Sequence, residues 1–297
     1  MTAVNITADQ VRELRELTGA GMLDCRKALV ATGGDIKAAI EKLRMEGSAK
    51  AVKKAGRTAA DGTVAIASGP DAMAIVELNC ETDFVAKGVD FQQFAATAAA
   101  VALKERPATI GQLAAAKSGA QTLEEARQTM IAKIGENITL RRVEVIRSAG
   151  GPLAQYVHAG NRIGVIVALE KGDLELGKDI AMHVAAQRPQ FLKAADVPAA
   201  VQDSERKVIE AQTAEQAAGK PADIVKKMVE GKLRKFLAEI TLLGQAFVKD
   251  PDQTVEKTLA SRGGAVARFV RFEVGEGIEK EGGDFAADVA AMIKPKH

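Results

Sequence analysis

The chain has 297 residues, of which 47% are hydrophobic but only 3% aromatic, with a single Tyr and no Trp. This composition excludes a disordered chain, and it means that Ala, Val, Leu and Ile must build the interior. Lys and Arg number 41 against 39 Asp and Glu, which gives a formal net charge of +2. Such a balance disfavours a general nucleic-acid binder, because such proteins carry a basic face with few acids.

The sequence shows neither a membrane span nor a secretion signal. No apolar run approaches the ~20 residues that a spanning helix needs, and the first residues lack the basic and apolar regions of a signal peptide. The two cysteines, Cys25 and Cys80, lie far apart and form no CxxC pair. We therefore expect reduced, buried thiols in a cytoplasmic protein that has no membrane partner.

The first part of the chain predicts three short helices. Thr7 and Gln10 form a capping-box pair before the first helix. A Gly-Gly pair ends the second helix, and Asp35 caps the third. Apolar residues recur at helical spacing in each helix: Val11, Leu14 and Leu17 in the first, Leu23 and Ala28, which we expect to point inward, in the second (Met22–Leu29), and Ile36, Ala39, Ile40 and Leu43 along one face of the third. The polar, basic stretch from Ser48 to Gly62 predicts a linker.

A strand-like period follows the predicted linker. Thr63–Ala67 and Met73–Leu78 flank the turn Ser68–Asp71, and this pattern predicts a β-hairpin. Further elements are expected in the order helix 90–104, helix 122–134 and strand 137–146.

The hairpin and the elements after it are repeated. An offset of 91 residues (160 − 69) places Gly69 on Gly160 and aligns Ile75, Val76 and Leu78 with Ile166, Val167 and Leu169. The closing strand repeats at an offset of 129 (271 − 142), where Arg142–Val145 aligns with Arg271–Val274. The sequence therefore predicts a duplicated α+β core with small antiparallel sheets, whose second copy carries about 38 extra residues (129 − 91).

The extra residues of the second copy contain two helical stripes. The stripes are Val201, Val208 and Ala211, then Ile224, Val225, Met228 and Val229, with Gly219–Pro221 between them. Two helices joined by a tight turn predict an antiparallel helical hairpin. Its apolar seam closes either on itself or on a second copy of the chain, and the sequence leaves both arrangements open.

The turn after the first hairpin differs between the two copies. Thr82–Val85 in the first copy corresponds to Asp173–Leu176 in the second, so the fold itself does not require Asp followed by Phe at this turn. In one interpretation, Thr82 or Asp83 caps the next helix and Phe84 packs in the core. In the other, Asp83 and Phe84 are exposed, and the ring can insert into another protein.

Several segments resemble the elongation factor Ts family. Thr82–Lys87 and Leu17–Leu29 are similar to its signature segments. Three further segments are similar to the family in the same order: Ile134–Asn137, His158–Gly164 and Arg271–Gly277. The resemblance covers nearly the whole chain. Leu23 departs from it, because relatives often carry a second Met there, but an apolar contact survives that exchange.

The resemblance implies a guanine-nucleotide exchange factor without catalytic residues, cofactor or metal. Its partner would be the GTPase elongation factor Tu, both GDP-bound and nucleotide-free. Thr82, Asp83, Phe84 and Val85 would form a wedge that disturbs the partner's Mg²⁺ and phosphate site. The other partner contacts would be Met22, Leu23, Ile134, Gly135, Glu136 and His158.

The resemblance also implies a division of the chain by role. A three-helix partner-binding domain like a ubiquitin-associated module would span residues 1–54, and core subdomain N would span 55–148. Core subdomain C would comprise 149–192 and 237–278, and a helical hairpin at 193–236 would make a homodimer. A C-terminal helical module would occupy 279–297, with its helix at Asp284–Ile293 docked on the partner.

No catalytic constellation is evident. None of His158, His183 and His297 has metal-ligand spacing, and no phosphate-loop motif occurs. We expect His183 to be a satisfied core histidine and Glu124–Glu125 to be a solvated helix face.

Two alternative functions compete with nucleotide exchange. The first is a binder of ubiquitin-like proteins built on the N-terminal bundle. The second is an RNA-binding translation protein that uses a basic set consisting of Lys50, Lys53, Lys54, Arg57, Arg141 and Arg142.

Overall fold

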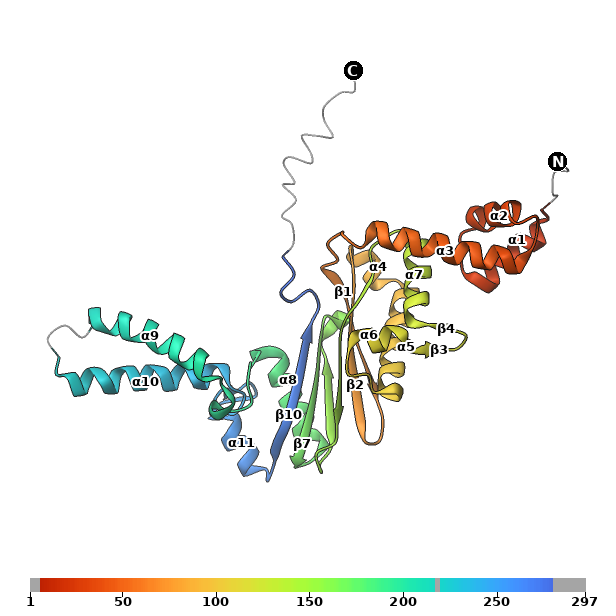
Figure 1. The fold of residues 1–297 in the computed structure, drawn as a ribbon. Coiled ribbons are helices and arrows are strands. Elements are labelled where there is room, and N and C mark those ends of the chain that lie inside the picture. The colour runs from red at the N-terminus through yellow and green to blue at the C-terminus, as the bar shows by residue number, and fades with distance from the viewer. Residues whose placement is uncertain (1–5, 217–219, 280–297) are drawn as a thin grey trace, which may run out of the picture. The chain divides into compact units, whose positions relative to one another are not determined.

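The computed structural model describes residues 6–216 and 220–279. It confirms an α+β protein and divides it into two compact units (Figure 1). Within the described residues, the first unit comprises 6–65, 76–143 and 273–279, and the second comprises 66–75, 144–216 and 220–272. The expected helix at Asp284–Ile293 lies outside the described residues. Within the described ranges, no helix combines the length and the apolar character needed to cross a bilayer.

The N-terminal bundle consists of α1 (Ala8–Thr18), α2 (Met22–Ala31) and α3 (Ile36–Lys54). Both hydrogen bonds of the capping box at Thr7 are present, and the Asp35 carboxylate accepts from the Ala38 amide at the start of α3. Its buried core contains Val11, Leu14, Cys25, Ala28, Leu29 and Ala39. The three predicted helices are therefore confirmed.

Two predictions about this region are wrong. Leu23 does not point inward: its residue is 72% exposed, because α2 turns Cys25, Ala28 and Leu29 to the core, and Leu23 lies on the other face. The segment from Ser48 is not a linker but the second half of α3, and β1 begins only at Asp61.

Small residues explain why the second half of α3 is helical. Gly47 and Ala51 are buried, and a Cβ placed on Gly47 would lie 3.7 Å from the Cβ of Ala132 on α7 (Leu123–Ile134). The close approach of two helices therefore stabilises a stretch whose lysines gave it the composition of a linker.

The first sheet has the strand order β1 (Asp61–Ser68), β2 (Ala72–Cys80) and β5 (Thr139–Arg147). Between β2 and β5 the chain forms α4 (Asp83–Lys87), α5 (Val89–Glu105), α6 (Ile110–Ala115), the two-residue strands β3 (Lys117–Ser118) and β4 (Gln121–Thr122), and α7. The hairpin, both helices and the closing strand are confirmed.

The prediction that Glu124–Glu125 is a solvated face is wrong. Both side chains are only partly exposed. The Glu124 carboxylate accepts from Arg127, and the Glu125 carboxylate accepts from the Thr122 amide as part of the capping box of α7.

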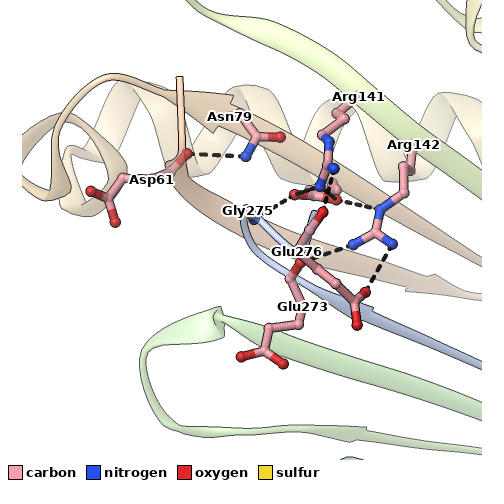
Figure 2. Close-up of polar contacts among 8 residues, drawn as sticks. Asp61, Asn79, Arg141, Arg142, Glu273, Gly275 and Glu276 are labelled. Atoms are coloured by element: carbon pink, nitrogen blue, oxygen red, sulfur yellow. Dashed lines mark hydrogen bonds and ion pairs between the residues drawn. The ribbon is translucent and has the colours of Figure 1, made fainter. Parts of the chain in front are cut away.

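The first unit contains a buried ion cluster that holds residues 273–275 (Figure 2). The fully buried carboxylate of Glu77 on β2 accepts from Arg141 Nη1 at 2.9 Å, from Arg142 Nε and from the Gly275 amide at 2.9 Å. Arg142 Nη2 also donates to the Glu273 carbonyl at 2.8 Å. Gly275 has φ +76°, and a Cβ there would clash with the Ala60 carbonyl oxygen, so only glycine fits.

The second three-stranded sheet repeats the strand arrangement of the first. β7 (Ile163–Lys171) lies between β6 (Leu153–Val157) and β10 (Ala265–Glu273), as β2 lies between β1 and β5. α8 (Leu174–Gln187) follows β7 directly and packs against both β6 and β7. The duplicated core is therefore confirmed by strand order. Besides the two long helices described next, the second unit contains β8 (Ala246–Phe247), β9 (Asp250–Thr254), α11 (Val255–Ser261) and short 3-10 turns at Ala159–Asn161 and Ala194–Asp196.

The extra residues of the second unit form two antiparallel helices, α9 (Ala199–Gln216) and α10 (Ala222–Ile240) (Figure 1). The stripe predicted on α9 does not line the seam with α10, because Val201, Val208 and Ala211 are exposed. Of the two arrangements that the sequence leaves open, pairing of this stripe with a second copy stays a prediction. Of the stripe predicted for α10, Val229 is buried and Ile224 is exposed. The seam instead joins Ile209 to Val229 and Leu233, with Phe236 and Leu237 packed beside them.

His183 on α8 is a satisfied core histidine, as predicted. Its residue is fully buried; the Val248 amide donates to Nδ1 at 3.1 Å, and Nε2 lies 3.0 Å from Gln245 Oε1. The Gln245 amide group donates to the Gln187 and Glu239 carbonyls, which turns its oxygen toward the ring. His183 is therefore neutral, with its proton on Nε2. Burial lowers its pKa below the ordinary 6.5, an effect that the Gln245 hydrogen bond partly offsets.

We expect the stability of the protein to decrease between pH 7 and pH 5 partly through His183. A folded pKa below the unfolded one gives stability that is fully present above pH 6.5 and is lost as the pH falls through the folded pKa. One such proton changes the free energy of unfolding by up to about 1.4 kcal/mol per pH unit. Urea denaturation at several pH values gives the free energy of unfolding as a function of pH. The slope of this free energy against pH should be smaller for His183→Gln than for wild type. His158→Gln, at an exposed site, should keep the full slope; an unchanged slope in His183→Gln would contradict the assignment.

Candidate partner-binding site

The site is centred on the turn that joins β2 to α5. Thr82 caps the five-residue helix α4, and its hydroxyl oxygen accepts from the Val85 amide. Below the turn, the buried Cys80 thiol donates to the Thr82 carbonyl at 3.1 Å. Burial, followed by the charge of Glu136, raises the pKa of this thiol to about 12, so it stays protonated and unreactive at physiological pH.

Phe84 points away from the protein. Its residue is 83% exposed, while Val85 is half-buried and Ala86 is buried beneath it. The exposed carboxylate of Asp83 pairs with Lys87 Nζ at 2.7 Å, and this hydrogen bond lowers the Asp83 pKa. Of the two interpretations of this turn, Thr82 does cap the helix, but Phe84 does not pack in the core.

A second exposed apolar residue, five positions after Phe84 in the chain (89 − 84), was not predicted from the sequence. Val89, at the start of α5, is 80% exposed. Gly88 separates α4 from α5 with extended backbone, so the two helices are not continuous. The sequence pattern that could have predicted this exposed residue is Gly88 followed by an apolar residue at the start of a helix.

The segment Ile134–Glu136 lies against the same turn. Gly135 ends α7 with φ +88°, and its carbonyl accepts from Lys54 Nζ. The Glu136 carboxylate accepts from the Thr82 amide at 3.0 Å and from the Thr82 hydroxyl at 2.6 Å. Ile134 and Glu136 are both half-buried. The structure therefore brings these residues together with Thr82–Val85.

The other predicted contact residues lie elsewhere in the fold. Met22 and Leu23 are exposed on α2 of the first unit. Leu23 lines a shallow apolar hollow together with Arg26, Lys27, Val30 and Ala31. His158 belongs to the second unit, where it is exposed and its Nδ1 lies 3.2 Å from the Tyr156 hydroxyl.

Comparison with known proteins accounts for nearly the whole chain. Residues 81–276 match the family model described as elongation factor TS. An elongation factor Ts from Methylococcus capsulatus is 56% identical over 98% of this chain and 99% of its own length. Proteins of the same name from Thioalkalivibrio sulfidiphilus and Hydrogenovibrio crunogenus are each 54% identical. The chain belongs to the elongation factor Ts family.

Membership of the elongation factor Ts family makes this protein a translation elongation factor. The relatives match the N-terminal bundle and the duplicated core together. If the protein bound ubiquitin-like proteins through the bundle alone, the duplicated core that these relatives share would have no function. This alternative is therefore not favoured.

The contacts of the basic residues also disfavour the RNA-binding alternative. Arg141 and Arg142 are held by the buried Glu77 carboxylate (Figure 2). Lys50 pairs with Asp24 at 3.1 Å, and Arg57 lies 3.5 Å from Glu81. A surface that binds nucleic acid needs cations that can reach phosphates, and most of this basic set is already engaged within the protein. Among the described residues, no group of three or more His, Cys, Asp and Glu side chains is arranged to hold a metal ion.

We expect Phe84→Ala to leave stability almost unchanged, within about 0.5 kcal/mol, because the ring has little native contact to lose. Phe91→Ala is the matched control, since that ring is fully buried on α5 and its loss should cost about 3–5 kcal/mol. Urea denaturation followed by circular dichroism measures both. Equal losses in the two variants would mean that the Phe84 ring packs inside the protein.

Proposed function

We propose that this elongation factor Ts family member is a guanine-nucleotide exchange factor for elongation factor Tu. It binds the GTPase in its GDP-bound and nucleotide-free forms and promotes GDP release so that GTP can bind. The protein acts by contact in the cytoplasm, with no catalytic residue, cofactor, membrane or nucleic acid. The exposure of Phe84 on a fixed turn is the observation that carries this proposal.

The chemistry of the turn suits a wedge. Insertion of the Phe84 ring between helices of the GTPase removes apolar surface from water, worth about 1.5–3 kcal/mol. The same insertion brings the carboxylate of Asp83 near the partner's Mg²⁺ site, where it competes for hydrogen-bond donors. Tight GDP binding depends on that ion and on backbone amides around the phosphates, so a small displacement of either weakens it.

No covalent chemistry is needed for this function. A protein that binds best to the nucleotide-free GTPase must weaken nucleotide affinity by the same factor, because the coupling is reciprocal. Each ~1.4 kcal/mol of differential binding weakens nucleotide affinity about tenfold. Contacts worth a few kcal/mol therefore suffice.

We further propose how the chain divides the work. Met22 and Leu23 in the bundle (1–54) and Ile134 and Gly135 in subdomain N (55–148) contact the nucleotide domain of the GTPase. His158 in subdomain C (149–192 and 237–278) contacts another domain of the partner. The hairpin at 193–236 serves dimerisation, and residues 279–297 add a further partner contact.

We expect Phe84→Ala to slow GDP release from elongation factor Tu by about ten- to hundredfold, the kinetic equivalent of the lost apolar transfer. The double variant with Asp83→Ala should be slower still. Stopped-flow release of a fluorescent GDP at saturating exchange factor measures the rate.

Leu174→Ala is the control for the wedge. Leu174 is an exposed apolar residue in the first turn of α8, next to Glu175, which is the counterpart of Phe84 at the offset of 91 residues (175 − 84). The loss of Leu174 should leave release unchanged. An unchanged rate in Phe84→Ala at saturation would remove the ring from the mechanism.

The exposed stripe on α9 supports the proposal of a homodimer. Val201 and Val208 lie one heptad apart on the same face, and Val208 is 47% exposed. This face does not belong to the seam with α10, which Ile209 occupies. A second copy of the hairpin can cover the stripe and bury its two branched side chains.

We expect Val201→Glu with Val208→Glu to shift the protein toward monomer in sedimentation equilibrium, because charges on this face oppose burial between copies. Lys207→Glu changes charge at an exposed neighbouring position of α9 and should keep the dimer. A dimer that resists the double substitution would place the interface outside this face.

A further inference from the structure

The carboxylate of Glu136 accepts several hydrogen bonds within the chain, so few of its acceptor positions remain for a partner. Oε2 accepts from the Glu81 amide at 3.1 Å and from the Thr82 amide at 3.0 Å, and Oε1 accepts from the Thr82 hydroxyl at 2.6 Å. Hydrogen bonds to an ionised carboxylate are among the strongest in proteins. Both oxygens are thus engaged within the chain, although the family resemblance implies a contact with the GTPase.

These bonds also determine how Thr82 caps α4. A hydroxyl has one proton and two lone pairs. Because the Thr82 proton is directed to Glu136, a lone pair faces the Val85 amide, which donates to the same oxygen at 3.4 Å. α4 has five residues and cannot hold its own geometry. Its direction therefore depends on this external carboxylate.

The segments of Glu81 and Glu136 hold each other through hydrogen bonds in both directions, and Asn137 connects them to a third segment. While Glu136 accepts from the Glu81 amide, the Glu81 carboxylate accepts from the Asn137 amide at 2.6 Å. The buried Asn137 side chain donates to the Arg57 carbonyl at 2.7 Å, just past the end of α3. The turn that carries Phe84 is thus tied to β2, to the end of α7 and to the chain after α3.

The corresponding turn of the second unit lacks an exposed Phe, and its helix is capped in a different way. There the strand β7 is followed directly by the 14-residue helix α8, which Asp173 caps with its own side chain by accepting from the Leu176 amide at 2.7 Å. A helix of this length with its own cap needs no carboxylate from elsewhere. The first unit has a short helix with an exposed ring and recruits Glu136.

We propose that Glu136 is a positioning residue for nucleotide exchange: it fixes the turn so that Phe84 is presented in its inserting direction before the partner arrives. The proposal rests on the exchange function proposed above. Preorganisation raises the effect of a contact because less conformational freedom is lost on binding. Glu136 acts through Phe84 and not through a contact of its own with the partner.

A double-mutant cycle tests this proposal with the full-length chain and elongation factor Tu loaded with fluorescent GDP. Glu136→Ala should slow GDP release about tenfold, the kinetic equivalent of one lost helix cap. In the Phe84→Ala background the same change should have less than about a twofold further effect, because the two residues act as one unit. Glu136→Gln, which keeps an acceptor for the Thr82 hydroxyl, should restore part of the rate.

Amide hydrogen exchange of the free protein is the second measurement. Glu136→Ala should speed exchange at the Glu81 and Thr82 amides, whereas Phe84→Ala should not. Glu125→Ala is the matched control, because its carboxylate also accepts from the amide of a capping threonine, Thr122, but at α7. This control should loosen the start of α7 without changing GDP release.

The outcomes separate the two proposals. A Glu136→Ala effect of equal size with and without the Phe84 ring would make Glu136 a direct partner contact and overturn the positioning role alone. Unchanged exchange at the Glu81 and Thr82 amides would also overturn it. A wild-type chain that fails to accelerate GDP release would contradict the exchange function, and the positioning role with it.

Discussion

The first unit depends on a single buried charge. Glu77 is fully buried, and the removal of its carboxylate from water is tolerated only because two arginines and a backbone amide surround it. The two arginines come from β5 and the amide from Gly275, so the Glu77 side chain on β2 joins segments that lie far apart in the chain. Removing one partner of such a cluster leaves a buried charge uncompensated, which is strongly destabilising.

Carboxylates also hold backbone segments together at the surface, in the turn that carries Phe84. An exposed phenylalanine on a five-residue helix is an unstable arrangement for an isolated segment, because the helix is too short and the ring gains nothing from its own protein. The reciprocal bonds of Glu81 and Glu136 supply the missing order. Polar bonds thus hold the turn, and the apolar ring remains exposed.

The two halves of the core show how a duplicated fold takes on different roles. Both place the second strand of their hairpin in the centre of a three-stranded sheet and continue into a helix. In the first half a glycine interrupts that helix and leaves α4 as a separate turn with Phe84 at its tip. In the second half the helix is continuous, and the extra sequence comes later, as α9 and α10.

The sequence by itself determined the local elements, because caps, glycine breaks and apolar spacing act over a few residues: the box at Thr7, the hairpin before Cys80 and the order of the repeat follow from them. Tertiary structure decided which faces are buried. The lysine-rich end of α3 is helical because Gly47 lies against α7 and Ala51 is buried, and Val208 is exposed because Ile209 occupies the seam. The role of Glu136 was beyond local reasoning, since its amide partner at Glu81 lies 55 residues away in the chain. Hydrogen bonds across such distances exist only once the fold has brought the segments together.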